Sequence, residues 1–451
     1  MSTTQNTAAN APVVALFGHT GNENLGDEAI TESVIANLKA RLPGVTFKLF
    51  TIVPEDSRQR HGYDSFPLRP EDDASISNIL YLNWQSVDDN SANAKAPLHE
   101  RDGWTYTQVA WRPTLKQRLR RLFDLVTNLP AIVRNERRFE KRNIERMKDV
   151  DLMIFTGSNQ FLDNFGGPWA FPFTLRRWAR IARKSNTPIA FASLGAGPIY
   201  SPLSMKHFRK AVKQAAYVSV RDKPSKTLLQ QAGCDVDIHV APDLAFSLPE
   251  RVNPRATDWQ HPVVGINPMP VYSSNYWYVS DARLYNNFVD ALAQTAVRLH
   301  ERGFPFFFFA TQTKDSNVMK DVFERLRENG HTQFDEDQLS RPSTTVAALQ
   351  ETMGSTDIIV ATRFHGTVIG LHSKKLVMST SYYRKAADLL EEFGLGDYAF
   401  QIEELQADEL MANIDRIIQE REQRAPKINA MQAQYEQELA AQYDTLCQLI
   451  R

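Results

Sequence analysis

Arg363 and His365 place two chemical groups at the end of an apolar run. The stretch 359–375, IVATRFHGTVIGLHSKK, begins as a buried strand would, and Gly366 follows the histidine. A guanidinium fork matches the oxygens of a carboxylate or phosphate, and an imidazole exchanges a proton near neutral pH. The two residues alternate on the predicted strand, so their side chains would share a face unless the strand has already turned. The pattern favours an anion site with an acid–base group, against a histidine satisfied in a core.

Two further strand ends carry polar groups of the same kind. Arg221 and Asp222 follow the apolar stretch YVSV, where the arginine could bind an anion or simply pair with Asp222. The stretch TGSNQFLDNFGG places Gly157 and Asp163 after another strand, and ligands of open parallel sheets lie at this edge. Asp163 is a candidate base toward a hydroxyl, although its spacing alone favours a turn or helix cap.

A glycine-rich loop joins the first predicted strand to the first predicted helix. The stretch GHTGNENLGDEA, residues 18–29, can hold an anion on loop amides and a helix N-terminus, with Asn22, Gly26 and Asp27 as candidate binding residues. Its spacing matches neither a dinucleotide fingerprint nor a P-loop. The alternative is a tight turn in which Gly21 and Gly26 adopt positive φ and Asp27 caps the helix.

Three other polar residues lie near predicted strand ends. Lys385, within SYYRKAADLL, stands at a helix start, where it could reach an anion or face solvent. Asp243, in APDLAF, and His372 lack comparable neighbours in the sequence and are interpreted as structural.

Short apolar strands alternate with amphipathic helices along most of the chain. This alternation predicts parallel sheets covered by helices on both faces. The pattern restarts after a proline-containing stretch near residue 250, which predicts two Rossmann-like domains facing a cleft. We expect a disordered tail (1–12), an N-terminal domain (13–248) with a helical and aromatic insertion (about 55–148), a linker (249–262), a C-terminal domain (263–400) and C-terminal helices (401–451).

Composition excludes several classes of partner and site. The 451 residues contain 52 Lys and Arg against 53 Asp and Glu, a formal charge of -1, which gives no reason to expect nucleic acid. Two isolated cysteines form neither a disulfide framework nor a zinc site and suit the cytoplasm. The polar N-terminus lacks the features of a signal peptide, and no apolar run reaches the ~20 residues of a membrane span.

The segment 112–148 is helical in pattern and strongly basic, with 12 Lys and Arg against four acids. Pro130 is expected to break or kink it. Three interpretations are open: a solvated helical face, an interaction surface, or a peripheral contact with the anionic inner face of a membrane.

Five stretches in order resemble the polysaccharide pyruvyl transferase family: GNENLGDEAI, FTGSNQFLD, SLGAGP, SVRDKPSKTLLQQAG with APDLAF, and ATRFHGTVIGLHSKKLVMSTSYYRKAADLLEEFGL. The similarity spans roughly residues 13–400. It implies a fold like the glycosyltransferase-B type, with a C-terminal helix that crosses back. It also implies transfer of a pyruvyl group from phosphoenolpyruvate to a sugar of a surface polysaccharide or its precursor, giving a ketal.

The resemblance also implies roles for single residues. Arg221 and Arg363 would bind phosphoenolpyruvate, His365 would protonate its methylene carbon, and Asp163 would be the base toward a sugar hydroxyl. No metal and no organic cofactor is implied, and the acceptor would be polymeric or lipid-linked. The alternatives are a sugar-nucleotide glycosyltransferase of the same architecture and a non-catalytic carbohydrate-binding protein.

Overall fold

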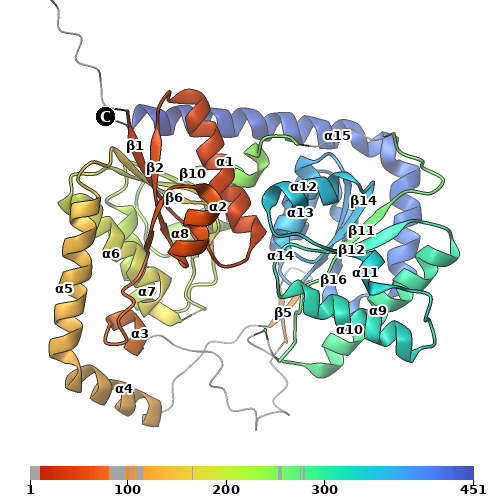
Figure 1. Cartoon of the computed structure of the whole chain (residues 1–451), viewed down its shortest axis with the longest axis horizontal. Coiled ribbons are helices and arrows are strands. Elements are labelled where there is room, and N and C mark those ends of the chain that lie inside the picture. Colours follow the sequence, from red (N-terminus) through yellow and green to blue (C-terminus); the bar gives the residue numbers. More distant parts are fainter. Residues whose placement is uncertain are drawn as a thin grey trace, which may run out of the picture.

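The computed structural model describes residues 11–80, 98–101, 104–107, 115–164, 166–251, 256–274, 276–277 and 280–450. Two parallel sheets, each flanked by helices, stand side by side and a long C-terminal helix spans both (Figure 1). The predicted α/β fold with two Rossmann-like units and glycosyltransferase-B-like architecture is confirmed. Outside the described residues lie 1–10 of the expected tail, 81–97, 102–103 and 108–114 of the expected insertion with its basic segment, and 252–255 of the expected linker.

The N-terminal sheet has the strand order β10-β9-β8-β6-β1-β2-β3, and β7 pairs with β8. All its pairings are parallel. The strands are β1 (Val13–Phe17), β2 (Thr46–Thr51), β3 (Asp64–Pro67), β6 (Leu152–Thr156), β7 (Asn159–Phe161), β8 (Ile189–Ala196), β9 (Tyr217–Val220) and β10 (His239–Val240). Strand β3 lies inside the range 55–148 that the sequence suggested as an insertion, so part of that range completes the sheet.

Alternating side chains of β1 explain why this sheet is buried on both faces. Val14 and Leu16 join one hydrophobic cluster, whereas Ala15 and Phe17 join another on the opposite face. The covering helices are α1 (Leu25–Arg41), α2 (Pro54–His61), α3 (Ile76–Leu80), α5 (Leu129–Arg146), α6 (Phe171–Lys184), α7 (Pro202–Val212) and α8 (Lys223–Gln231). Helix α4 (Leu115–Thr127) precedes α5, and β4 (Leu98–Arg101) pairs antiparallel with β5 (Trp104–Thr107).

The C-terminal sheet repeats the same topology in the order β13-β12-β11-β14-β15-β16. Its parallel strands are β11 (Val264–Asn267), β12 (Phe306–Ala310), β13 (Ser340–Pro342), β14 (Ile358–Ala361), β15 (Leu376–Ser381) and β16 (Ala399–Gln401). Its helices are α9 (Ala282–Glu301), α10 (Asp315–Glu328), α11 (Glu336–Leu339), α12 (Val346–Gly354), α13 (Phe364–His372) and α14 (Arg384–Glu392). In each sheet the strand order reverses once, at β1/β6 and at β11/β14, where open α/β sheets bind ligands.

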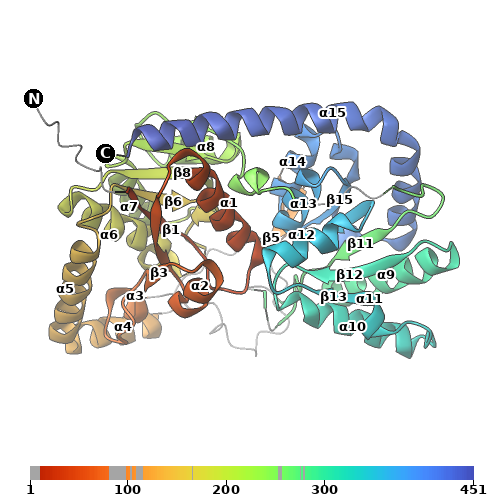
Figure 2. The same ribbon diagram turned by 45° about the horizontal axis from the view of Figure 1, so that its top comes forward.

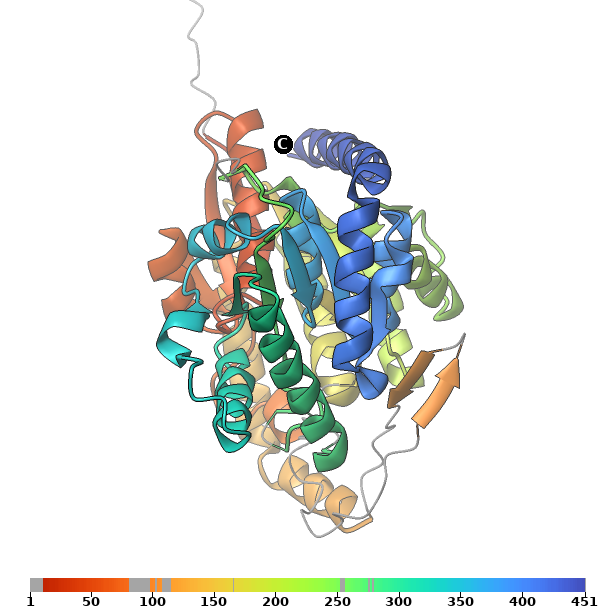
Figure 3. The same ribbon diagram turned by 90° about the vertical axis from the view of Figure 1, so that its right-hand side faces the viewer.

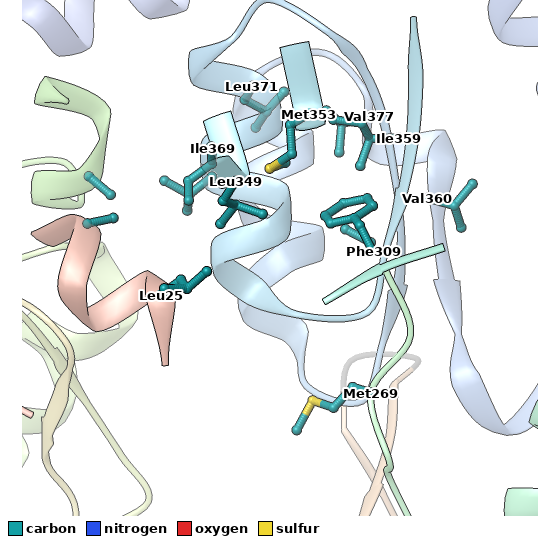
Figure 4. Packing of buried hydrophobic residues seen from close by; sticks show 14 of the residues in the cluster. Leu25, Met269, Phe309, Leu349, Met353, Ile359, Val360, Ile369, Leu371 and Val377 are labelled. Carbon is teal, nitrogen blue, oxygen red and sulfur yellow. The ribbon is translucent and has the colours of Figure 1, made fainter. Parts of the chain in front are cut away.

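One hydrophobic cluster runs through both halves. It includes Leu25 at the start of α1 together with Leu349 of α12 and Ile369 of α13. Figure 4 shows Leu25 reaching from α1 toward Leu349. Because the two halves share this core, their facing loops are held against each other.

The C-terminal helix α15 (Ala407–Gln448) crosses from the second half back to the first, as Figures 1 and 2 show. Gln442 lies buried there, where its Oε1 accepts hydrogen bonds from the hydroxyls of Ser219 (2.5 Å) and Tyr217 (3.1 Å). Its Nε2 donates to Ser193 Oγ at 2.9 Å. A bend in the helix is visible in Figure 3, and Pro426 within it removes a backbone donor, which favours bending.

Two local predictions can be compared with these elements. The strand expected to continue through His365 ends at Ala361, and α13 begins at Phe364. Pro130 separates two helices as expected, because α4 ends at Thr127 and α5 carries the proline in its first turn.

Candidate functional site

His365 lies where the two halves meet. Because β14 has already turned, Arg363 is the N-cap of α13 and His365 sits in the first helical turn. The expectation that both residues alternate on a strand is therefore wrong, although both still stand at the carboxyl end of β14. This is the switch-point edge of the C-terminal sheet.

Gly26 of the N-terminal half packs directly on the His365 ring. A Cβ added to Gly26 would lie 2.2 Å from His365 Nδ1. Only glycine permits this approach, so its role is close contact and not the positive φ suggested by the sequence. Gly21, by contrast, does adopt a φ of 76°.

The surroundings of His365 have opposing electrostatic effects. Burial lowers its pKa below the ordinary 6.5, the carboxylates of Asp243 and Asp27 raise it, and Arg221 and Arg363 lower it. Its Nε2 lies 3.8 Å from Asp243 Oδ2 and has no hydrogen-bond partner among the described residues. Two cations and two carboxylates from both halves thus surround one buried ring nitrogen that is open to a further partner.

Asp27 supplies a buried carboxyl group on the N-terminal side of this cluster. It lies in the first turn of α1, and its Oδ2 accepts a hydrogen bond from Asn24 Nδ2 at 2.8 Å. Burial raises its pKa, opposed by His365 and by a hydrogen bond with Ser158. Asn24, not Asp27, caps the helix, because Asn24 accepts from Gly26 N. Asp27 is thereby left facing the cluster.

Arg363 is fixed by a buried carboxylate. Its Nε (2.9 Å) and Nη2 (2.5 Å) both donate to Asp315 Oδ1, and its Nη1 donates to Tyr276 Oη at 2.7 Å. Asp315 raises the pKa of Arg363 above its already high value, which burial alone would lower. Of five guanidinium N–H groups, two are left without a bond among the described residues. Asp315 therefore orients a fork that still has donors for an anion.

The Asp315 loop also connects the two halves. Asp315 Oδ2 accepts the backbone N–H groups of Thr311 (3.1 Å) and Gln312 (3.0 Å). Thr311 O in turn accepts the N–H of Leu25 at 2.9 Å. The start of α1, which carries Gly26 and Asp27, is thus held against the residues that orient Arg363.

Arg221 approaches the cluster from the end of β9. Its Nη1 donates to Asp243 Oδ2 at 2.9 Å, and its guanidinium lies over the ring of Phe364, 4.3 Å from the centroid. Asp243 therefore lies between Arg221 and His365. The sequence suggested a structural role for Asp243 and did not predict its contacts with these two residues. Asp222 caps α8 through Ser225 N at 2.6 Å, so the proposed Arg221–Asp222 pair is secondary.

Lys385 donates to a neutral oxygen near Arg221. Lys385 Nζ donates to Asn159 Oδ1 at 2.7 Å. A Cβ on Gly195 would lie 2.6 Å from that oxygen and 2.9 Å from Arg221 Nη2. Burial and the nearby Arg221 lower the pKa of Lys385 to about 7. Asp243 already pairs with Arg221, and Asp222 opposes part of the lowering of the Lys385 pKa. The hydrogen-bond acceptor of Lys385 is a neutral amide oxygen, so its ammonium group can still hold an anion.

The remaining predicted residues lie apart from His365 or have structural partners. Both carboxylate oxygens of Asp163 accept backbone N–H groups, from Tyr200 (2.9 Å) and Ser201 (2.8 Å). This geometry favours the capping alternative over a catalytic base. Gly157 has a φ of +37°, and a Cβ there would meet Ile30, whereas Asn22 is exposed on the loop. Among the described residues, no group of three His, Cys, Asp or Glu is placed to hold a metal ion.

Half-buried aromatic rings adjoin Arg363. The ring centroids of Trp277 and Tyr382 lie 5.0 Å apart, those of Tyr382 and Tyr383 4.9 Å, and those of Tyr276 and Trp277 6.1 Å. Tyr276 is the residue that accepts from Arg363. Partly exposed rings beside a charged site are typical of pockets that bind a ligand with both apolar and polar faces.

Sequence reasoning missed Asp315 and Asn159 and undervalued Asp243. Their place in the sequence could have indicated them. Each follows a strand directly or after a short polar loop, as the predicted site residues do. Spacing alone does not show which carboxylate folds onto which arginine.

A family model described as polysaccharide pyruvyl transferase matches residues 24–382. No curated protein matches the sequence significantly. The matched range contains every residue of the cluster around His365 and ends before Lys385.

Solved structures match the fold over nearly the whole chain. Anabaena Alr3699/HepE in complex with UDP-glucose has a TM-score of 0.51 at 11% identity, covering 97% of this chain and 98% of that one. A glycosyltransferase from Rickettsia africae ESF-5 gives 0.52 at 13%, covering 97% and 99%. UDP-GlcNAc 2-epimerase from Neisseria meningitidis bound to UDP-GlcNAc gives 0.51 at 11%, covering 93% and 94%. At these identities the likeness concerns the fold alone.

Proposed function

The chain belongs to the polysaccharide pyruvyl transferase family, and on that premise we propose that it transfers a pyruvyl group from phosphoenolpyruvate to two hydroxyls of a saccharide, forming a ketal. The acceptor is a sugar of a surface polysaccharide or of its lipid-linked precursor. Phosphoenolpyruvate is the donor substrate, and no metal or organic cofactor takes part in the proposal.

The arrangement around His365 carries this proposal. Its buried Nε2 has no hydrogen-bond partner among the described residues, while Arg221, Arg363, Asp27 and Asp243 act on its pKa from both halves. A donor with a carboxylate and a phosphate on neighbouring atoms needs cations on more than one side. It also needs an acid that can reach its methylene carbon.

We assign the donor to the cations on either side of the histidine. The two remaining N–H groups of Arg363 suit a carboxylate, because Asp315 fixes the fork in advance. Lys385, which donates to the neutral oxygen of Asn159, and Arg221, which lies beside the same Gly195 as that oxygen, suit the phosphate. A bound phosphate would raise the pKa of Lys385 and restore its full charge.

In the proposed reaction each proton has a donor and an acceptor among the substrates, His365 and Asp27. His365 gives its Nε2 proton to the methylene carbon, which becomes the methyl group and leaves C2 cationic. A sugar hydroxyl attacks C2 and loses its proton to Asp27, which takes the role that the sequence suggested for Asp163. The C2–O bond to phosphate breaks, a second hydroxyl attacks C2, and its proton leaves with the phosphate. Proton return from Asp27 to His365 completes the cycle.

We place the acceptor on the aromatic side of Arg363. Sugar rings present C–H faces that pack on aromatic rings, and Trp277, Tyr382 and Tyr383 are half-buried beside the fork. Binding there would bring a sugar next to the donor without using the cations that hold it.

Phosphate release from phosphoenolpyruvate tests the proposal. We expect release that depends on an added saccharide fraction and falls by roughly 10²–10⁴-fold in His365→Gln, because general acid catalysis contributes about that much. His239→Gln, a change of an exposed histidine, should retain the activity. Release of UDP from UDP-sugars with no use of phosphoenolpyruvate would instead identify a glycosyltransferase.

A further inference from the structure

Helix α4 exposes an apolar stripe. Leu115, Leu119, Leu122 and Val126 recur at intervals of four, three and four residues, which places them on one helical face. Exposed fractions are 58% for Leu119, 57% for Leu122, 67% for Phe123 and 62% for Val126. Isolated exposed apolar residues are common, but a continuous stripe of this kind marks an interaction surface.

Basic residues border the stripe. By helical periodicity Lys116 and Arg120 flank one side of it and Arg118 the other, and Asp124 is the acid of this helix. Helix α5 continues the positive charge with exposed residues that pair with no described carboxylate: Arg134, Arg137, Arg138, Lys141 and Arg142.

Two of the three acids of α5 are engaged with α6, and the third, Glu145, is exposed and pairs with Lys148 at 2.8 Å. Glu136 pairs with Arg177 at 2.9 Å, and Glu140 pairs with Arg180 at 2.7 Å and Lys184 at 2.6 Å. These arginines and Lys184 belong to α6, so these two carboxylates face the body of the protein. The outer surface of the α4–α5 pair is left with an excess of positive charge.

Helix α4 packs against α3 and α5 and projects at a lower corner of the molecule in Figures 1 and 2. No helix in the described part of the chain is long and apolar enough to cross a membrane. A surface attachment needs no such helix. It needs an amphipathic helix with apolar residues on one face and Lys and Arg beside them.

We propose that α4 docks on an anionic lipid bilayer, with its leucine stripe in the headgroup boundary and the cations of α4 and α5 on acidic headgroups. Long basic side chains extend from the edge of such a helix to the headgroups while their stems lie along apolar surface. The proposal does not depend on the identity of the donor or acceptor.

A second copy of this chain fits the same surface less well. A two-fold contact would place the stripe of one copy on that of the other. Arg118, Arg120 and Lys116 of both copies would then meet, with Asp124 as the acid of each helix to offset them. Charge complementarity therefore favours acidic lipid.

Flotation with vesicles tests the proposal on the full-length protein. One set is phosphatidylcholine alone and the other contains about a third phosphatidylglycerol. We expect binding to the anionic set at about 0.05 M salt and its loss at about 0.5 M, because salt screens exposed charges. Leu119→Glu with Phe123→Glu should weaken binding by at least about tenfold, since two buried apolar contacts are removed.

Two controls distinguish a specific loss of lipid binding by α4 from a general effect of an added glutamate or of unfolding. Val240→Glu changes an exposed apolar residue on β10, far from the helix pair in sequence, and should bind as the unaltered protein does. Circular dichroism of each variant checks that the fold is retained. Equal flotation of the α4 variant, or no flotation of the unaltered protein with anionic vesicles, would overturn the proposal. A dimer in solution that the α4 variant dissociates would assign the stripe to a second copy instead.

Discussion

The neighbouring residues together determine the pKa of His365. Burial keeps the free imidazole neutral at neutral pH, while Asp243 and Asp27 oppose that effect. A general acid must be protonated before it reacts, so the bound substrate has to raise the pKa of His365. A phosphate near the ring has that effect, because negative charge stabilises the imidazolium.

The pH dependence of kcat/KM should show this acid. In the free protein the pKa of His365 lies below 6.5. Because the protonated form is the active one, kcat/KM should fall as pH rises, with a midpoint below 6.5. Steady-state kinetics with phosphoenolpyruvate from pH 5 to about 8.5 measure it. A profile that is unchanged in His365→Gln would assign the acid to another group.

Asp27 and Asp163 can be distinguished by matched substitutions. Asp27→Asn should lower kcat by roughly 10²-fold or more with a small change in stability, because it removes a proposed base. Asp163→Asn should instead lower stability by about 1–3 kcal/mol, because two backbone N–H groups lose a charged acceptor. Urea unfolding and turnover are measured on both. The reverse pattern would return the base to Asp163.

At the scale of elements, helix starts carry most of the site. Gly26 and Asp27 open α1, Arg363 and His365 open α13, and Lys385 opens α14. The sequence predicted the starts of α1 and α14 from apolar periodicity and glycine placement, but not the start of α13. The turn after Ala361 was missed because TRFHG contains no strong break signal, and strand and helix patterns are alike in so short a run.

Helix α15 is expected to hold the two halves together through Gln442. Gln442→Ala would leave the buried hydroxyls of Ser193 and Ser219 without this partner, so we expect a loss of about 2–4 kcal/mol in the free energy of unfolding. Urea denaturation measures it. Gln434→Ala, an exposed residue on the same helix bonded to Glu438, is the control and should stay within about 0.5 kcal/mol. Equal effects would mean that Gln442 contributes nothing specific.

At the scale of the whole molecule, alternation of strands and helices was enough to predict two parallel sheets. What the sequence could not predict was the contact between them. Leu25 with Leu349, Gly26 with His365, and Asn159 with Lys385 join residues more than 200 positions apart. Such pairs depend on the relative placement of two finished sheets, which local patterns do not encode.

Buried histidines throughout the molecule should make it less stable in mild acid. Burial lowers the pKa of His19 to about 3 and that of His207 to about 4, and lowers those of His365 and His372. Unfolding lets each take a proton below about pH 6.5, so stability is full above that pH and falls below it.

For His19, whose ring packs on Phe171 but remains partly exposed, the loss between pH 7.5 and 5.5 is at most about 1.4 kcal/mol. Asp27, Glu32, Asp388 and Glu403 act in the opposite direction, since burial raises their pKa values. We expect a lower unfolding midpoint at pH 5.5, and a smaller difference in His19→Asn. A midpoint independent of pH would contradict the burial of these rings as neutral groups.

Thermal unfolding with phosphoenolpyruvate tests the central claim, that the site between the two halves holds this donor. A ligand at 100 times its Kd stabilises the native state by about 2.7 kcal/mol. Lys385→Met removes a proposed donor contact, and Lys374→Met, which changes an exposed lysine, is its control. We predict that millimolar phosphoenolpyruvate raises the midpoint of the unaltered protein and of Lys374→Met but not that of Lys385→Met. A rise with UDP-glucose alone, or an equal rise in all three proteins with phosphoenolpyruvate, would contradict the account.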